Sequence, residues 1–163
     1  MAINRETSLF FDASVLVAAS HSPAGGSALV LAACQAGGFQ ACTTSAVLIE
    51  SQRTLEDFPE RSSDRFHELL ANIPWRLLPV PPEAVIERYA QYVDPKDAHV
   101  LAAAVEGRAD FLLTLDRRHI LAAAVGVQQA GLTVKILRPG DFIQQYYPQH
   151  ESYTNLPAPR RGA

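Results

Sequence analysis

The stretch KDAHVLAAAVEGRADFLLTLD, residues 96–116, predicts a helix followed by a buried strand. The apolar residues that follow Asp97 share one helical stripe: Val100, Leu101, Ala104 and Val105. Residues 111–115 then form a strand-like run, apolar except for Thr114, that ends at Asp116, as is typical of a strand buried on both faces of a parallel sheet. The stretch therefore indicates one helix-to-strand unit of an α/β protein.

The rest of the chain repeats this alternation. Further strands are expected at residues 9–11, 39–43, 75–80 and 134–137, and further helices at 13–20, 27–36, 45–55, 60–73, 83–93 and 139–147. Strands that alternate with helices of about ten residues imply right-handed crossovers. The predicted fold is α/β, a three-layer α/β/α sandwich with a mainly parallel central sheet.

The length of 163 residues fits one domain, which we expect over residues 1–147. Residues 148–163 are polar and rich in proline, with no apolar period, so we expect a disordered tail there. The net charge of −3 excludes the simplest signature of a nucleic-acid-binding protein, a strongly basic domain. Cys34 and Cys42 lack zinc or redox spacing, and the chain shows no signal peptide and no membrane-length apolar run. A soluble, cytoplasmic protein is the expectation.

Two aspartates follow predicted strands directly, Asp12 after residues 9–11 and Asp116 after residues 111–115. Both would lie at the carboxyl edge of the sheet, where open α/β proteins bind ligands. Ser14 and Thr114 are two residues from these acids, which places a hydroxyl on the same side of an extended chain. Each acid thus gains a possible hydroxyl neighbour.

Asp97 and Glu50 each fall in an early turn of a predicted helix and can face the same edge. Unit charges 4 to 5 Å apart repel by roughly 3 to 4 kcal/mol per pair at an effective dielectric near 20, so a converging cluster needs a bound cation or protonated carboxyls. An oxygen-rich site favours Mg²⁺ or Mn²⁺, and such ions serve phosphodiester hydrolysis. Taken singly, each acid reads equally well as a turn or helix residue. We assign the neighbouring Asp94 and Asp110 to turns.

These residues carry a resemblance to a known family. Residues 96–116 resemble the PIN-domain family of metal-dependent ribonucleases, with its aspartate-started helix and its strand ending in Thr-x-Asp. FFDAS at 10–14 is similar to the first-strand Asp-x-Ser motif of the family, and SAVLIES at 45–51 to its helix with a central glutamate. Order and spacing match over about residues 8–142. Leu115 and Ser14 depart from the commonest residues at their positions.

The resemblance implies a metal-dependent endoribonuclease. In this sequence the catalytic and metal-binding residues would be Asp12, Glu50, Asp97 and Asp116. They would hold one or two Mg²⁺ or Mn²⁺ ions, with Ser14 and Thr114 as supporting hydroxyls. Many small members are VapC-like toxins of toxin-antitoxin pairs, commonly dimeric, so RNA, an antitoxin protein and a second copy of the chain are the expected partners.

Arg117 and Arg118 directly follow Asp116 and are candidate substrate-binding residues, because guanidinium groups suit phosphate. A solvated helix start explains the same residues equally well. Two other functions compete with the nuclease: a catalytically silent PIN-like module that binds RNA or a protein partner, and a receiver-like phosphorylation switch. The switch lacks a phosphoacceptor acid in LLPV at 77–80, and its late lysine would be Lys135, inside a strand.

Overall fold

A five-stranded parallel sheet forms the centre of the computed structural model, which describes residues 1–159. Its strands are β1 (Ser8–Phe11), β2 (Gln40–Thr44), β3 (Arg76–Leu78), β4 (Phe111–Leu113) and β5 (Lys135–Leu137). They lie in the order β3-β2-β1-β4-β5, and all neighbours pair in parallel. The predicted α/β fold is thereby confirmed.

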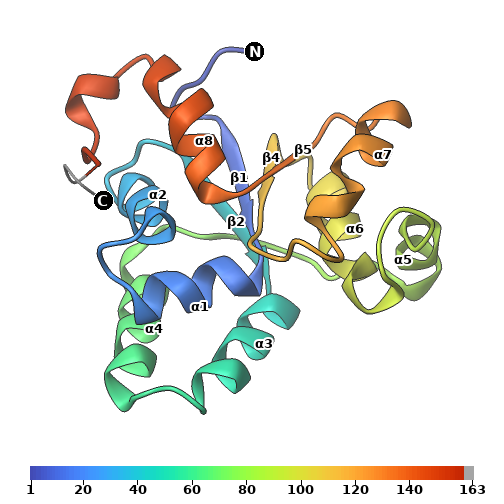
Figure 1. The fold of residues 1–163 in the computed structure, drawn as a ribbon, viewed down its shortest axis with the longest axis horizontal. Helices are drawn as coiled ribbons and strands as arrows, with labels where there is room; N and C mark the ends of the chain where they lie inside the picture. Colours follow the sequence, from blue (N-terminus) through green and yellow to red (C-terminus); the bar gives the residue numbers. More distant parts are fainter. Residues whose placement is uncertain (160–163) are drawn as a thin grey trace.

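Helices cover both faces of the sheet. They are α1 (Ala13–His21), α2 (Gly26–Gln35), α3 (Ser45–Leu55), α4 (Glu60–Asn72), α5 (Glu83–Tyr89), α6 (Ala98–Glu106), α7 (Ala124–Gln129) and α8 (Pro139–Gln145). Figure 1 shows α1, α2 and α8 on one side of the strands and α5, α6 and α7 on the other. Short 3₁₀ turns complete the chain at Pro95–Asp97, Leu121–Ala123, Tyr147–Gln149 and Tyr153–Asn155.

The central strand β1 is buried along its whole length, and its Leu9, Phe10 and Phe11 side chains are 0% exposed. A strand covered on both faces needs apolar residues at successive positions, which explains the unbroken run LFF. Burying each such side chain contributes roughly 1.5–3 kcal/mol. The edge of Phe11 also packs against Trp75 at a centroid distance of 5.8 Å. Asp12, which directly follows β1, is therefore attached to a fully buried strand.

The strand order reverses between β1 and β4. Phe11 of β1 pairs with Leu113 of β4, so the residues that follow them, Asp12 and Thr114, leave the sheet side by side. This is the switch point of an open parallel sheet, where a crevice for ligands opens at the carboxyl ends of the strands. The order also differs from the 2-1-3-4-5 arrangement of receiver-like folds, which removes the phosphorylation switch from consideration.

The C-terminal segment differs from the expectation of disorder from residue 148. His150 is buried and forms a bridge with Ile3, while its Nε2 lies 2.6 Å from the carbonyl oxygen of Gly38. The Tyr147 hydroxyl donates to the carbonyl oxygen of Pro157. Specific hydrogen bonds thus order this segment although it has no apolar period. Residues 160–163 of the expected tail lie outside the described residues.

Between residues 1 and 159, no single helix combines the length and apolar character needed to cross a membrane. The consecutive helices α1 and α2 reach that length and hydropathy only together, and they meet at a bend of 97°.

Candidate metal centre

Asp12 occupies the N-cap position of α1, but its carboxylate does not cap the helix. Instead, Oδ2 accepts hydrogen bonds from Ser14 Oγ at 2.9 Å and from Thr114 Oγ1 at 2.7 Å. An N-cap aspartate normally accepts from the free N–H groups of the first turn. The two hydroxyls hold this carboxylate, only 6% exposed, in a different orientation, at the crevice between β1 and β4.

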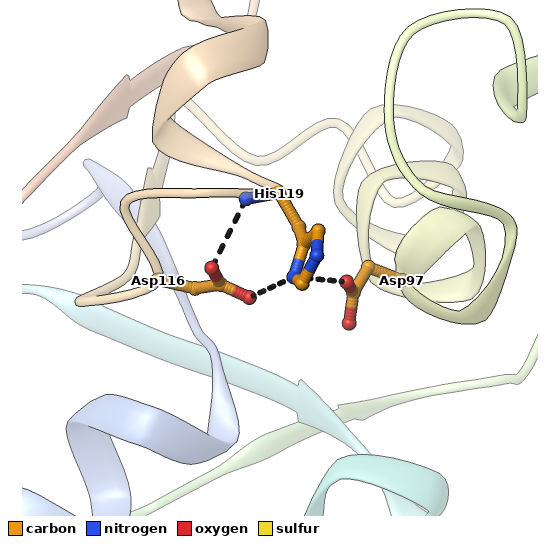
Figure 2. Close-up of side chains that lie close together, drawn as sticks. All are labelled: Asp97, Asp116 and His119. Carbon is orange, nitrogen blue, oxygen red and sulfur yellow. Dashed lines mark hydrogen bonds and ion pairs between the residues drawn. The ribbon is translucent and has the colours of Figure 1, made fainter.

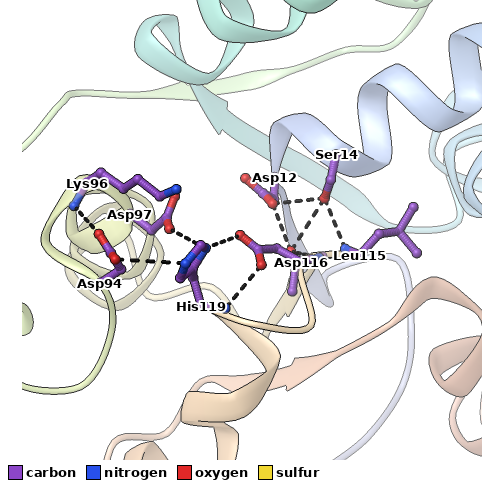
Figure 3. A network of polar contacts seen from close by, with 9 residues as sticks. Asp12, Ser14, Asp94, Lys96, Asp97, Leu115, Asp116 and His119 are labelled. Carbon is purple, nitrogen blue, oxygen red and sulfur yellow. Dashed lines mark hydrogen bonds and ion pairs between the residues drawn. The ribbon is translucent and has the colours of Figure 1, made fainter.

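The loop after β4 is shaped by the same two hydroxyls (Figure 3). Thr114 Oγ1 accepts the backbone N–H of Asp116 at 3.0 Å, and Ser14 Oγ accepts that of Leu115 at 2.9 Å. Both hydroxyls therefore donate toward Asp12 while accepting from the backbone of the loop. Asp12 and Asp116 are thereby linked through one side chain, that of Thr114.

Asp97 precedes α6 and, like Asp12, leaves its helix uncapped. Its Oδ2 atom is buried and has no hydrogen-bond partner within the described chain. Burial raises the pKa of this carboxyl above its usual range, and the negative charges of Asp116 and Asp12 raise it further, against the opposing effect of Lys96 and His119. A buried carboxylate oxygen without a donor is costly, and a bound cation would relieve that cost.

Three side chains converge at the crevice: Asp97, Asp116 and His119 (Figure 2). One ligand atom from each lies within 4.8 Å of the other two. His119 Nδ1 lies 3.5 Å from Asp97 Oδ2 and 3.3 Å from Asp116 Oδ2, and the backbone N–H of His119 donates to Asp116 Oδ1 at 3.1 Å. Two carboxylates, one of them with an unpartnered buried oxygen, and an imidazole form a donor set that fits a divalent cation.

Glu50 lies on α3, is exposed, and is not part of this close group. Burial of the carboxyl and then the charge of Asp12 raise its pKa, with a smaller contribution from Asp97. His99 and Lys96 act in the opposite direction. The four predicted acids therefore share one electrostatic environment, although only Asp97 and Asp116 belong to the close group around His119.

His119 and Asp94 lie closer to the acids than the sequence predicted. The turn assigned to Asp94 exists, because its Oδ1 accepts the Lys96 N–H at 3.0 Å, but its Oδ2 also faces His119 Nε2 at 3.8 Å. The available signal was the position of His119, three residues after Asp116 and immediately after two arginines. Asp110, the other assigned turn residue, lies at the opposite end of β4 and accepts the Ser8 N–H at 2.8 Å.

Arg117 and Arg118 are both exposed on the loop between Asp116 and His119. Neither forms an ion pair with any residue between 1 and 159. Their guanidinium groups are therefore available to a ligand at the rim of the crevice.

Comparison with known proteins identifies the family. The family model described as PIN domain matches residues 8–118, and the chain belongs to the PIN-domain family. No curated protein matches the sequence.

Two solved structures are similar to this chain at low sequence identity, and the first shares its fold. VapBC2 from Rickettsia felis, crystallised with a DNA fragment from its promoter, is 12% identical with a TM-score of 0.53, over 79% of this chain and 98% of that chain. VapC20 from Mycobacterium tuberculosis, a sarcin-ricin loop cleaving toxin, is 13% identical with a TM-score of 0.48, over 64% of this chain and 86% of that chain.

Proposed function

We propose that this protein is a metal-dependent endoribonuclease that hydrolyses RNA phosphodiester bonds. The observation that carries the proposal is the convergence of Asp97 and Asp116 beside Asp12 at the switch point, with a buried Asp97 oxygen that accepts no hydrogen bond from residues 1–159. Membership of the PIN-domain family supports the same chemistry.

The four acids Asp12, Glu50, Asp97 and Asp116 would hold one or two Mg²⁺ or Mn²⁺ ions. A divalent ion in such a site polarises phosphoryl oxygens and makes water a better nucleophile at neutral pH. Ser14 and Thr114 keep the Asp12 carboxylate oriented, which preserves its position during reaction. Arg117 and Arg118 would bind RNA phosphates at the rim and offset the acidic crevice.

The decisive experiment compares Asp12→Asn with wild type in an RNA cleavage assay containing Mn²⁺ or EDTA. Wild type should cleave only with metal, and the variant should lose at least a hundredfold in rate. Asp110→Asn is the matched control, since Asp110 lies at the far end of β4 and should leave cleavage unchanged. Metal-dependent cleavage that survives in Asp12→Asn would reject the site, and absence of cleavage by a metal-bound wild type would favour a silent binding module.

We further propose that the protein is the toxin of a toxin-antitoxin pair and acts as a homodimer. The fold shared with VapBC2 supports this assignment. Inducing expression in a bacterial host should arrest growth for wild type and not for Asp12→Asn, and co-expression of the product of an adjacent small gene should restore growth. Growth that continues under induction of active wild type would instead indicate a free-standing nuclease. Light scattering of the purified chain tests the dimer.

A further inference from the structure

The imidazole of His119 is placed to do more than neutralise nearby charge. Its Nδ1 faces Asp97 Oδ2 at 3.5 Å and Asp116 Oδ2 at 3.3 Å at the same time. Neighbouring ligand atoms of an octahedral ion with bonds of about 2.1 Å are roughly 3 Å apart. The two distances from Nδ1, 3.5 and 3.3 Å, are thus close to the spacing of neighbouring ligands on a single ion, and one ligand atom of each of the three residues lies within 4.8 Å of the others.

The backbone of His119 is anchored, and its ring has a carboxylate at each nitrogen. The His119 backbone N–H donates to Asp116 Oδ1 at 3.1 Å, and the next residue, Ile120, is buried. Asp94 Oδ2 lies 3.8 Å from Nε2, and the other oxygen of Asp94 accepts the Lys96 N–H. A carboxylate facing one ring nitrogen is the arrangement that directs the lone pair of the other nitrogen to a metal.

Resting on the function proposed above, we propose that His119 is a nitrogen ligand of the active-site metal and that it makes the site prefer Mn²⁺ over Mg²⁺. Mg²⁺ takes oxygen ligands almost exclusively and keeps its waters, whereas imidazole suits first-row transition ions. Asp94 is the positioning residue for the ring. A site made only of carboxylates has no such reason to discriminate between the two ions.

The experiment measures metal binding in the full chain, independently of RNA cleavage. Isothermal titration with MnCl₂ and with MgCl₂ compares wild type, His119→Gln and Asp94→Asn. His119→Gln should weaken Mn²⁺ binding at least tenfold while changing Mg²⁺ binding by less than threefold. Asp94→Asn should weaken Mn²⁺ binding by about 10- to 100-fold, as loss of an outer carboxylate does elsewhere. His119 is partly exposed on a loop, so the fold should survive, and circular dichroism checks this.

His99 provides the matched control, because it is the other imidazole that acts on this group of acids and its Nδ1 has no partner among the described residues. Pulsed EPR of the Mn²⁺-loaded protein should detect nitrogen-14 coupling in wild type and His99→Gln, and none in His119→Gln. Coupling that persists in His119→Gln, or equal losses for Mn²⁺ and Mg²⁺, overturns the ligand role while leaving the nuclease intact. Wild type that binds neither metal overturns both proposals.

Discussion

The hydroxyl of Thr114 donates a 2.7 Å hydrogen bond to Oδ2 of Asp12, joining residues 102 positions apart at the carboxyl ends of β4 and β1. Thr114 is fully buried and also accepts the Asp116 N–H. The Thr114 hydroxyl therefore connects two acids of the proposed metal site. Because the partners come from neighbouring strands, this contact forms only when β1 and β4 are paired in their native register.

Replacing Thr114 with valine should therefore damage stability and activity together. Valine keeps the volume but removes the acceptor of the Asp116 N–H and one of the two hydroxyl donors of Asp12 Oδ2, so that only Ser14 still donates to that oxygen. Loss of the partner of a buried polar group costs about 1–3 kcal/mol. Urea denaturation should show a loss in this range, and Mn²⁺ affinity should fall. Thr114→Ser retains the hydroxyl and should keep most of the Mn²⁺ affinity. If the serine variant binds Mn²⁺ as weakly as the valine variant, packing of the threonine methyl group, and not the hydrogen bond, determines the affinity.

Asp97→Asn should stabilise the metal-free protein at neutral pH. The folded-state pKa of Asp97 is raised by burial and by Asp116, so ionisation costs more in the folded than in the unfolded chain. The contribution of protonated Asp97 to the free energy of unfolding is fully present below the unfolded-state pKa of about 4. It is lost as the pH rises through the raised folded-state pKa. Thermal melts in EDTA should show the melting temperature of wild type falling below that of the variant between pH 4 and 7.

The melting temperatures of wild type and Asp97→Asn in EDTA should differ by a few degrees, since 1 kcal/mol shifts the melting temperature of a chain of this length by about 2–4 °C. Mn²⁺ at 100 times its Kd should then stabilise wild type by about 2.7 kcal/mol and the variant by much less. A variant that melts below wild type in EDTA at pH 7 would contradict the idea that repulsion and desolvation dominate this carboxyl.

Asp110 should behave as a structural acid, unlike the four acids of the crevice. Its Oδ2 accepts the N–H of Ser8, the first residue of β1, at the edge of the sheet remote from the metal centre. Asp110→Ala removes that acceptor and should lower the free energy of unfolding by about 1–2 kcal/mol. Titration calorimetry should find unchanged Mn²⁺ affinity; a tenfold loss would show that the two ends of β4 are coupled.

His150→Ala should destabilise the fold by about 1–3 kcal/mol, because the Gly38 carbonyl and the Ser152 N–H would both lose their partner. The exposed His67→Ala is the matched control and should change stability by less than about 0.5 kcal/mol. Equal melting temperatures for the two variants would contradict a stabilising role for His150 and would favour the disorder that the composition of this segment suggests.

The sequence predicted the strands around the crevice well, because burial on both faces forces unbroken apolar runs such as LFF and FLL. It also proposed four acids from their places after strands and in early helical turns, and of these the structure brings Asp97 and Asp116 into one close group. The roles of His119 and Asp94 escaped prediction because they depend on two loops meeting in space, which no periodicity encodes. Likewise, His150 is held by Gly38, 112 positions away, through a single hydrogen bond that composition cannot reveal.

The strand order has a consequence for the cell that makes this protein. Asp12 and Glu50 are synthesised early, whereas Asp116 follows β4, which must enter the sheet beside β1 after β2 and β3 have been made. A chain still emerging from the ribosome, or one ended prematurely before residue 116, holds at most three of the four acids and no complete crevice. If the protein cleaves RNA, a nascent chain therefore cannot cleave the message from which it is being translated before residue 116 has been made.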